Sequence, residues 1–131
     1  MSVIYQNEHI RIEVEPSSIP WLKIFTNHPY KEMSEVPQEI RYEIYELLNT
    51  IEKEMIEYYN PTKINIASFG NYVPHVHWHI MARFEDDTHY PEPMWGEKQR
   101  EDTLNLPSFD GFIEKLCIIN YLLIPIETIE S

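Results

Sequence analysis

The stretch "NYVPHVHWHIMARF", residues 71–84, places three histidines at every second position. They are His75, His77 and His79, and they make up half of the six histidines in the chain. Successive side chains of a β-strand point to opposite faces of a sheet, so the three imidazoles share one face and the apolar residues between them share the other. The segment is therefore predicted to be a strand whose apolar side faces the core and whose histidines line an open face.

The segments around this strand predict a mixture of strands and helices. Period-two alternation predicts strands before the histidine segment at residues 3–15 (a hairpin), 21–26 and 63–69. Residues 37–59 instead repeat apolar side chains every three to four positions, which is typical of an amphipathic helix, with Ser34 as its candidate N-cap. After the histidine strand we expect a long loop over residues 85–107 and a final short helix that starts near Ser108.

Composition and charge exclude several classes of protein. At 131 residues the chain is long enough to bury one core, and we expect a single domain over residues 1–131. Its net charge of -12 argues against nucleic-acid binding, which depends on clustered Lys and Arg side chains. The single cysteine cannot form an internal disulfide, and we expect neither a signal peptide nor a membrane span, because the N-terminal residues lack a basic region followed by a long apolar segment and no apolar run is long enough to cross a membrane. We therefore expect a cytoplasmic protein without nucleic-acid or membrane partners.

Three histidines on one strand face indicate one of two kinds of site. Alternate imidazoles can bind zinc at roughly 2.0–2.1 Å, which requires a further ligand from elsewhere, for example from the acidic residues after the strand. Alternatively, a neutral imidazole can attack an electrophile at physiological pH while a protonated neighbour donates to the leaving group. Phosphorus is the favoured electrophile, because protonated histidines and backbone amides stabilise its non-bridging oxygens. His77, which has a histidine on each side, is then the candidate nucleophile.

The segment from His75 to Met81 resembles the signature of the histidine triad family, in which three histidines alternate with apolar residues and two further apolar residues follow. The preceding "FGNYVP" is similar to the family's glycine-containing turn, and the order of strands, long helix, two strands and tail agrees as well. The resemblance implies an α+β fold with a mainly antiparallel five-stranded sheet, one long helix and a C-terminal helix. It also implies a homodimer.

The family further implies cleavage at the α-phosphate of a nucleotide through a covalent nucleotidyl-histidine intermediate. In that scheme His77 attacks phosphorus through Nε2 while a backbone carbonyl holds its Nδ1–H. His79 contacts phosphate oxygens and assists the leaving group, and His75 orders the site. The implied substrate is a dinucleoside polyphosphate or a nucleoside phosphoramidate. No built-in cofactor is implied, and magnesium is expected only as the companion of a polyphosphate.

Four further residues are candidates for substrate binding. Asn71 lies where family members commonly carry a glutamine that contacts the α-phosphate, and Asn65 lies near another polar family position. Arg83 shares the histidine face, where it is either solvated or in contact with a distal phosphate. Trp95, in the long loop, is expected to cover the site, to reach a partner subunit or to pack on its own domain. Trp21 lies where some members have a further histidine, so a four-histidine site is not expected.

Two alternatives to a nucleotide hydrolase or transferase stay open at the level of sequence. One is a metal-dependent enzyme that uses His75, His77 and His79 as ligands. The other is a module that binds nucleotides or partners without turnover. Stoichiometric zinc would favour the first, and tight binding of adenosine monophosphate without cleavage of any substrate would favour the second. Fold resemblance does not separate them, because function resides in the site.

Overall fold

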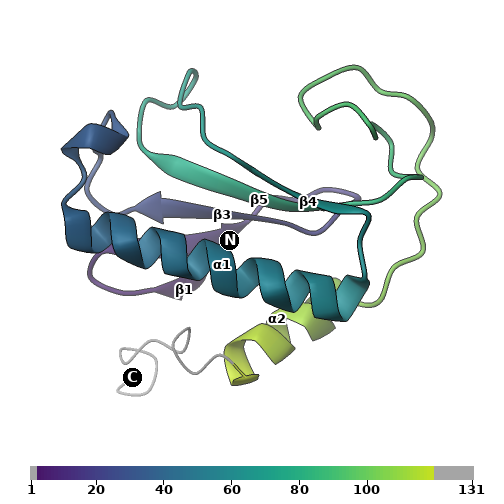
Figure 1. Ribbon diagram of the computed structural model, residues 1–131, viewed down its shortest axis with the longest axis horizontal. Coiled ribbons are helices and arrows are strands. Elements are labelled where there is room, and N and C mark those ends of the chain that lie inside the picture. Colours follow the sequence, from purple (N-terminus) through teal and green to yellow (C-terminus); the bar gives the residue numbers. More distant parts are fainter. Residues whose placement is uncertain (1–2, 120–131) are drawn as a thin grey trace.

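The computed structural model describes residues 3–119 and shows a five-stranded antiparallel sheet with one long and one short helix (Figure 1). The strands are β1 (Val3–Gln6), β2 (Ile10–Val14), β3 (Trp21–Thr26), β4 (Lys63–Ala67) and β5 (His77–Arg83), in the order β1-β2-β3-β5-β4. The helices are α1 (Gln38–Tyr59) and α2 (Phe109–Ile119), and a short 3-10 turn, η1 (Met33–Glu35), precedes α1. The expected α+β fold is thereby confirmed.

The core lies between the sheet and α1. The helix buries the apolar stripe that its 3.6-residue period predicts, which consists of Ile40, Ile44, Leu47, Leu48, Ile51, Met55 and Tyr59. The facing side chains of the central strands, such as Ile24 and Ile80, have no exposed surface. α2 lies beside the end of α1, where Phe112 packs against Tyr58 at a centroid distance of 5.5 Å. Within residues 3–119, neither helix is long and apolar enough to cross a membrane.

A proline lies at each end of α1. The prediction of Ser34 as the N-cap is wrong, because the helix begins at Gln38 after Pro37, while Ser34 lies within η1. At the other end Asn60 adopts the left-handed conformation (φ 49°), and the proline that follows cannot continue the helix. These ends fix where the chain turns back into β4, which lies at one edge of the sheet.

Strand register places side chains of β3 beside the histidines. The cross-strand pairs on this face are Phe25–His77, Lys23–His79 and Trp21–Met81. β5 begins at His77, so the strand is shorter than the alternation from Pro74 predicts, and His75 lies just outside it. The long loop before α2 is confirmed, since no described residue between Arg83 and Phe109 lies in a helix or strand.

Candidate active site

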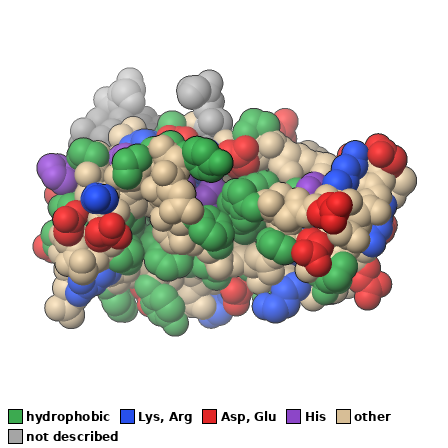
Figure 2. Space-filling model, turned by 90° about the horizontal axis from the view of Figure 1, so that it is seen from above, with side chains coloured by type: hydrophobic (Ala, Val, Ile, Leu, Met, Phe, Trp, Pro, Cys, Tyr) green, Lys and Arg blue, Asp and Glu red, His purple; other side chains and the backbone are tan. Residues whose placement is uncertain are grey.

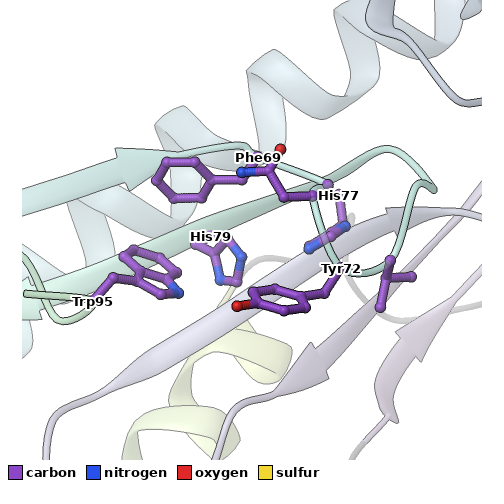
Figure 3. Close-up of a pocket in the computed structure, with 8 residues that line it drawn as sticks. Phe69, Tyr72, His77, His79 and Trp95 are labelled. Atoms are coloured by element: carbon purple, nitrogen blue, oxygen red, sulfur yellow. The ribbon is translucent and has the colours of Figure 1, made fainter.

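A pocket of about 320 Å³ lies on the histidine face of the sheet, between the turn after β4 and the long loop (Figure 3). Its lining consists of Phe69, Gly70, Asn71, Tyr72, Val73, His77, His79 and Trp95. Figure 3 shows the ring of His79 between Trp95 and His77, with the rings of Phe69 and Tyr72 on either side. Seen from above, hydrophobic side chains occupy the middle of the molecule and charged ones lie mainly toward its ends (Figure 2). Two motif histidines therefore share a pocket with aromatic walls.

His77 is held in a single orientation by the backbone just before its strand and by β3. Its Nδ1 lies 2.7 Å from the carbonyl oxygen of His75, and its ring stacks on Phe25 at a centroid distance of 4.7 Å and an interplanar angle of 15°. A carbonyl oxygen only accepts hydrogen bonds, so Nδ1 carries a proton, and in the neutral ring Nε2 is the nitrogen that keeps its lone pair. The backbone contact that the family resemblance implied for this ring is present.

His75 stabilises the site without being part of the pocket lining. It lies outside the strand and does not line the pocket. Its Nε2 donates to the carbonyl oxygen of Thr26 (2.6 Å), and its ring meets Phe25 edge-on at 5.5 Å. The carbonyl of His75 accepts the hydrogen bond from Nδ1 of His77. The hydrogen bond from His75 to Thr26 on β3 therefore also fixes the carbonyl that orients the ring of His77.

His79 is buried, with 8% of its surface exposed, so the expected open face is closed at this position. Its Nδ1 accepts a hydrogen bond from the indole Nε1 of Trp21 at 3.0 Å. Burial, followed by the nearby His77 and Lys23, lowers the pKa of His79 from 6.5 to about 4, and Glu15 acts in the opposite direction. His79 is therefore neutral at physiological pH.

Arg83 has a structural environment that the sequence does not reveal. It is 1% exposed, so the expectation that it is solvated is wrong. Its Nε and Nη2 donate to the carboxylate of Asp87 at 2.9 and 3.1 Å, and further donors reach Oδ1 of Asn65 (2.8 Å) and the carbonyl of Glu92 (2.7 Å). Neither Arg83 nor Asn65 lines the pocket. Together they hold the start of the loop that carries Trp95.

Trp95 lies over the site, which is one of the positions expected from the sequence. Its ring meets those of Phe69 and His79 edge-on, each at a centroid distance of 4.8 Å, and that of Trp21 at 5.3 Å. It keeps 48% of its surface exposed, so it forms a wall at the mouth of the pocket. Asn71 also lines the pocket, from the turn after β4, and its side chain is exposed.

Basic side chains flank the pocket but do not line it. The guanidinium of Arg11 lies 4.6 Å and the ammonium of Lys23 5.6 Å from the centroid of Phe25, on the histidine face. Each is paired with a carboxylate, Arg11 with Glu13 at 2.7 Å and Lys23 with Glu15 at 2.8 Å. Sequence reasoning missed both cations. The alternation in β3 could have placed Lys23 and Phe25 on one face, but it could not identify β5 as the neighbouring strand.

The described residues offer no ready-made metal site. Among residues 3–119, no group of three or more His, Cys, Asp or Glu side chains is arranged to hold a metal ion. One ring nitrogen of each motif histidine is already hydrogen-bonded, to a carbonyl for His75 and His77 and to an indole N–H for His79. The metal-ligand interpretation therefore lacks a converging donor set in this part of the chain.

Comparisons with known proteins agree on the fold. The HIT domain family model matches residues 1–86. A histidine triad protein from Bradyrhizobium japonicum is 24% identical, with a TM-score of 0.71 over 87% of this chain and 86% of that one. A diadenosine triphosphate hydrolase from Plasmodium falciparum is 20% identical, with a TM-score of 0.57 over 92% and 75% of the two chains. A zinc-bound histidine triad family protein from Mycobacterium smegmatis is 15% identical, with a TM-score of 0.63 over 92% and 86%.

A search of curated protein sequences gives no match. At these identities, the likeness to solved structures shows a shared fold.

Proposed function

The chain belongs to the HIT domain family, and from this premise we propose that it cleaves nucleotides at the α-phosphate through a covalent nucleotidyl-histidine intermediate. The observation that carries the proposal is the 2.7 Å hydrogen bond between Nδ1 of His77 and the carbonyl of His75. It puts the proton of the neutral ring on Nδ1, so that Nε2 of His77, in the lining of the pocket, is the nitrogen with the lone pair that a nucleophilic imidazole requires. A structural neighbour that is named a diadenosine triphosphate hydrolase is consistent with this chemistry.

The proposed reaction has two steps. In the first, Nε2 of His77 bonds to the α-phosphorus, the bond from phosphorus to the leaving atom breaks, and its electron pair departs with the leaving group. In the second, water attacks the phosphorus and loses a proton, and the nucleoside monophosphate departs as the imidazole is restored. Dividing one displacement into two lowers the barrier of each step. We propose that Asn71 contacts a non-bridging oxygen and that His79 contacts the leaving atom, since both residues line the pocket.

The charge of the pocket bears on the substrate. No Lys or Arg side chain is part of its lining, and two cations that flank it, Arg11 and Lys23, are already paired with glutamates. The net charge of -12 further disfavours a polyanion. A dinucleoside polyphosphate is therefore expected to bind as its magnesium complex, whereas a nucleoside phosphoramidate, with fewer charges, is expected to need no metal.

Incubation with a diadenosine polyphosphate and with adenosine phosphoramidate tests this proposal. We expect adenosine monophosphate as a product, an acid-labile adenylyl adduct on the peptide that contains His77, and a magnesium requirement for the polyphosphate alone. If adenosine monophosphate binds while every candidate substrate stays intact over long incubation, the protein is a binding module. If activity instead requires stoichiometric zinc and chelators abolish it, the metal-dependent alternative holds.

We also propose a homodimer that forms at the β4 edge of the sheet. A groove of about 430 Å³ lies beside this edge, between α1 and the sheet, and Ile66, Tyr45 and Trp78 are part of its lining. Ile66 is 41% and Tyr45 65% exposed, and Nε1 of Trp78 is buried without a hydrogen-bond partner among residues 3–119. An open edge strand beside exposed apolar side chains is a typical association surface.

Ile66→Glu is expected to shift the protein from dimer to monomer, because it puts a charge into the proposed interface. Light scattering measures the molar mass directly. Val3→Glu is the matched control, since Val3 is also an exposed apolar residue (42%) but lies on β1, at the opposite edge of the sheet. A wild-type protein that is already monomeric, or equal effects of both variants, would contradict this assignment.

A further inference from the structure

A buried hydrogen bond joins Trp21 on β3 to His79 on β5. Nε1 of the indole lies 3.0 Å from Nδ1 of the imidazole, and the two residues are 9% and 8% exposed. Their ring centroids are 5.7 Å apart at an interplanar angle of 65°. Trp95 packs edge-on against both rings, at 5.3 Å from Trp21 and 4.8 Å from His79. The pair is therefore fixed from the pocket side as well as from the sheet.

The chemistry of the two rings decides where the proton of His79 lies. An indole N–H only donates, so Nδ1 of His79 has to be the acceptor and carries no proton. The neutral ring then has its proton on Nε2. Protonation of Nδ1 would set two N–H groups against each other in a site shielded from water and would leave both unsatisfied. This hydrogen bond therefore opposes the imidazolium form.

The charged and titratable groups around His79 come from several elements. On its own strand, the ring of His77 lies at a centroid distance of 5.1 Å. Lys23 is its cross-strand partner on β3 and is paired with Glu15, which follows β2. The phenol of Tyr72 lines the same pocket from the turn after β4. Among these groups only Glu15 favours a charged His79, and Lys23 already pairs with its carboxylate.

On the basis of the proposed function, we propose that Trp21 is a positioning residue that holds His79 as a neutral imidazole with its proton on Nε2. His79 then stabilises the leaving atom by a hydrogen bond and keeps its proton. When the bond from phosphorus to the leaving atom breaks, the electron pair goes to the leaving atom, which departs as an anion. Such a site favours leaving groups that are stable anions, such as a phosphate, over an amine, which has to be protonated before it leaves.

Two substrates of matched shape test this inference: adenosine 5′-(4-nitrophenyl phosphate) and the corresponding 4-nitroanilide. In the wild type we expect kcat/KM for the ester to exceed that for the anilide by about 10²-fold or more, the range that general acid catalysis commonly supplies. In Trp21→Phe, Nδ1 of His79 loses its donor and can take a proton, so we expect the pKa of His79 to rise, while burial and the nearby His77 and Lys23 still lower it. The ester-to-anilide ratio is then expected to fall by about tenfold or more at pH 5.5, because protonated His79 supplies the general acid that the amine needs.

Nitrogen-15 NMR of His79 gives a readout that does not depend on turnover. We expect the Nε2–H tautomer alone in the wild type, and a tautomer mixture with a higher titration midpoint in Trp21→Phe. Trp95→Phe is the control, because Trp95 packs on His79 without a hydrogen bond to it, so the tautomer should not change. An unchanged tautomer and pH profile in Trp21→Phe would overturn the inference. If neither substrate is cleaved by the wild type, the proposed function fails, while the NMR result still decides the role of Trp21.

Discussion

His77→Ala is expected to abolish turnover while the protein stays folded. Loss of a covalent nucleophile typically costs on the order of 10⁴ to 10⁶ in kcat. The fold should survive, because the His77 ring is only half-buried, lines the pocket, and makes its hydrogen bond to the backbone carbonyl of His75, two residues earlier. Measurements of kcat/KM, together with adduct trapping and a thermal unfolding curve, separate a loss of chemistry from a loss of structure.

His28→Ala is the matched control for this experiment. His28 is an exposed histidine that does not line the pocket, so its replacement should leave both kcat/KM and the adduct unchanged. Persistence of the adenylyl adduct in His77→Ala would show that another group attacks phosphorus. In that case the hydrogen bond between His77 and the carbonyl of His75 would not identify His77 as the nucleophile.

Asp87→Ala is expected to cost about 3–5 kcal/mol of unfolding free energy, because it leaves the guanidinium of Arg83 buried without its counter-ion. Both residues are essentially inaccessible, with 1% exposure for Arg83 and 0% for Asp87. The Asp87 carboxylate also accepts hydrogen bonds from the amides of Phe84 (2.9 Å), His89 (3.0 Å) and Tyr90 (2.8 Å). The substitution therefore removes the group around which the start of the long loop is folded.

The protonation of Asp87 adds a pH dependence to this prediction. Burial raises the pKa of Asp87, but hydrogen bonds from Arg83 and from backbone amides outweigh it, so the pKa lies below its ordinary 3.8. The folded chain thus binds this proton less tightly than the unfolded chain does. The contribution of Asp87 to stability is complete above the unfolded pKa and is lost as the pH falls through the folded pKa. In Asp87→Ala this part of the acid sensitivity should disappear.

Urea unfolding at neutral pH and at acid pH measures both effects. Glu101→Ala is the control, because Glu101 forms an exposed ion pair with Lys98 (3.2 Å) and its side chain is 89% exposed. Its loss is expected to change the unfolding free energy by about 0.5 kcal/mol or less. If Asp87→Ala were as mild as Glu101→Ala, the Arg83–Asp87 pair would not be what stabilises the loop.

Much of the fold could be predicted from local patterns. The period-two segments became strands, the stripe over residues 37–59 became α1, and the long loop and α2 follow where expected. The start of the helix was predicted wrongly. Ser34 is a good capping residue by type, but it lies in η1 and Pro37 sets the first turn of α1. Propensity identifies candidate ends, and the geometry of the preceding turn selects among them.

The site was predictable only in part. Alternation placed His77 and His79 on one face, and the pocket brings them together with Asn71 and Trp95. Arg83 continues the same alternation, yet it is buried against Asp87 and takes no part in the pocket. Its environment depends on how the long loop folds back over the strand, which strand alternation does not encode.

Which side chains share a face of the histidine strand follows from the order of the residues alone, because backbone geometry within one strand is local. The chemical state of those side chains depends instead on contacts between distant parts of the chain. The hydrogen bond that sets the proton on His79 comes from Trp21, 58 residues earlier in the chain, and it exists because β3 and β5 are neighbours in the sheet. A tautomer depends on the partner of the ring, and that partner is chosen by strand pairing and burial.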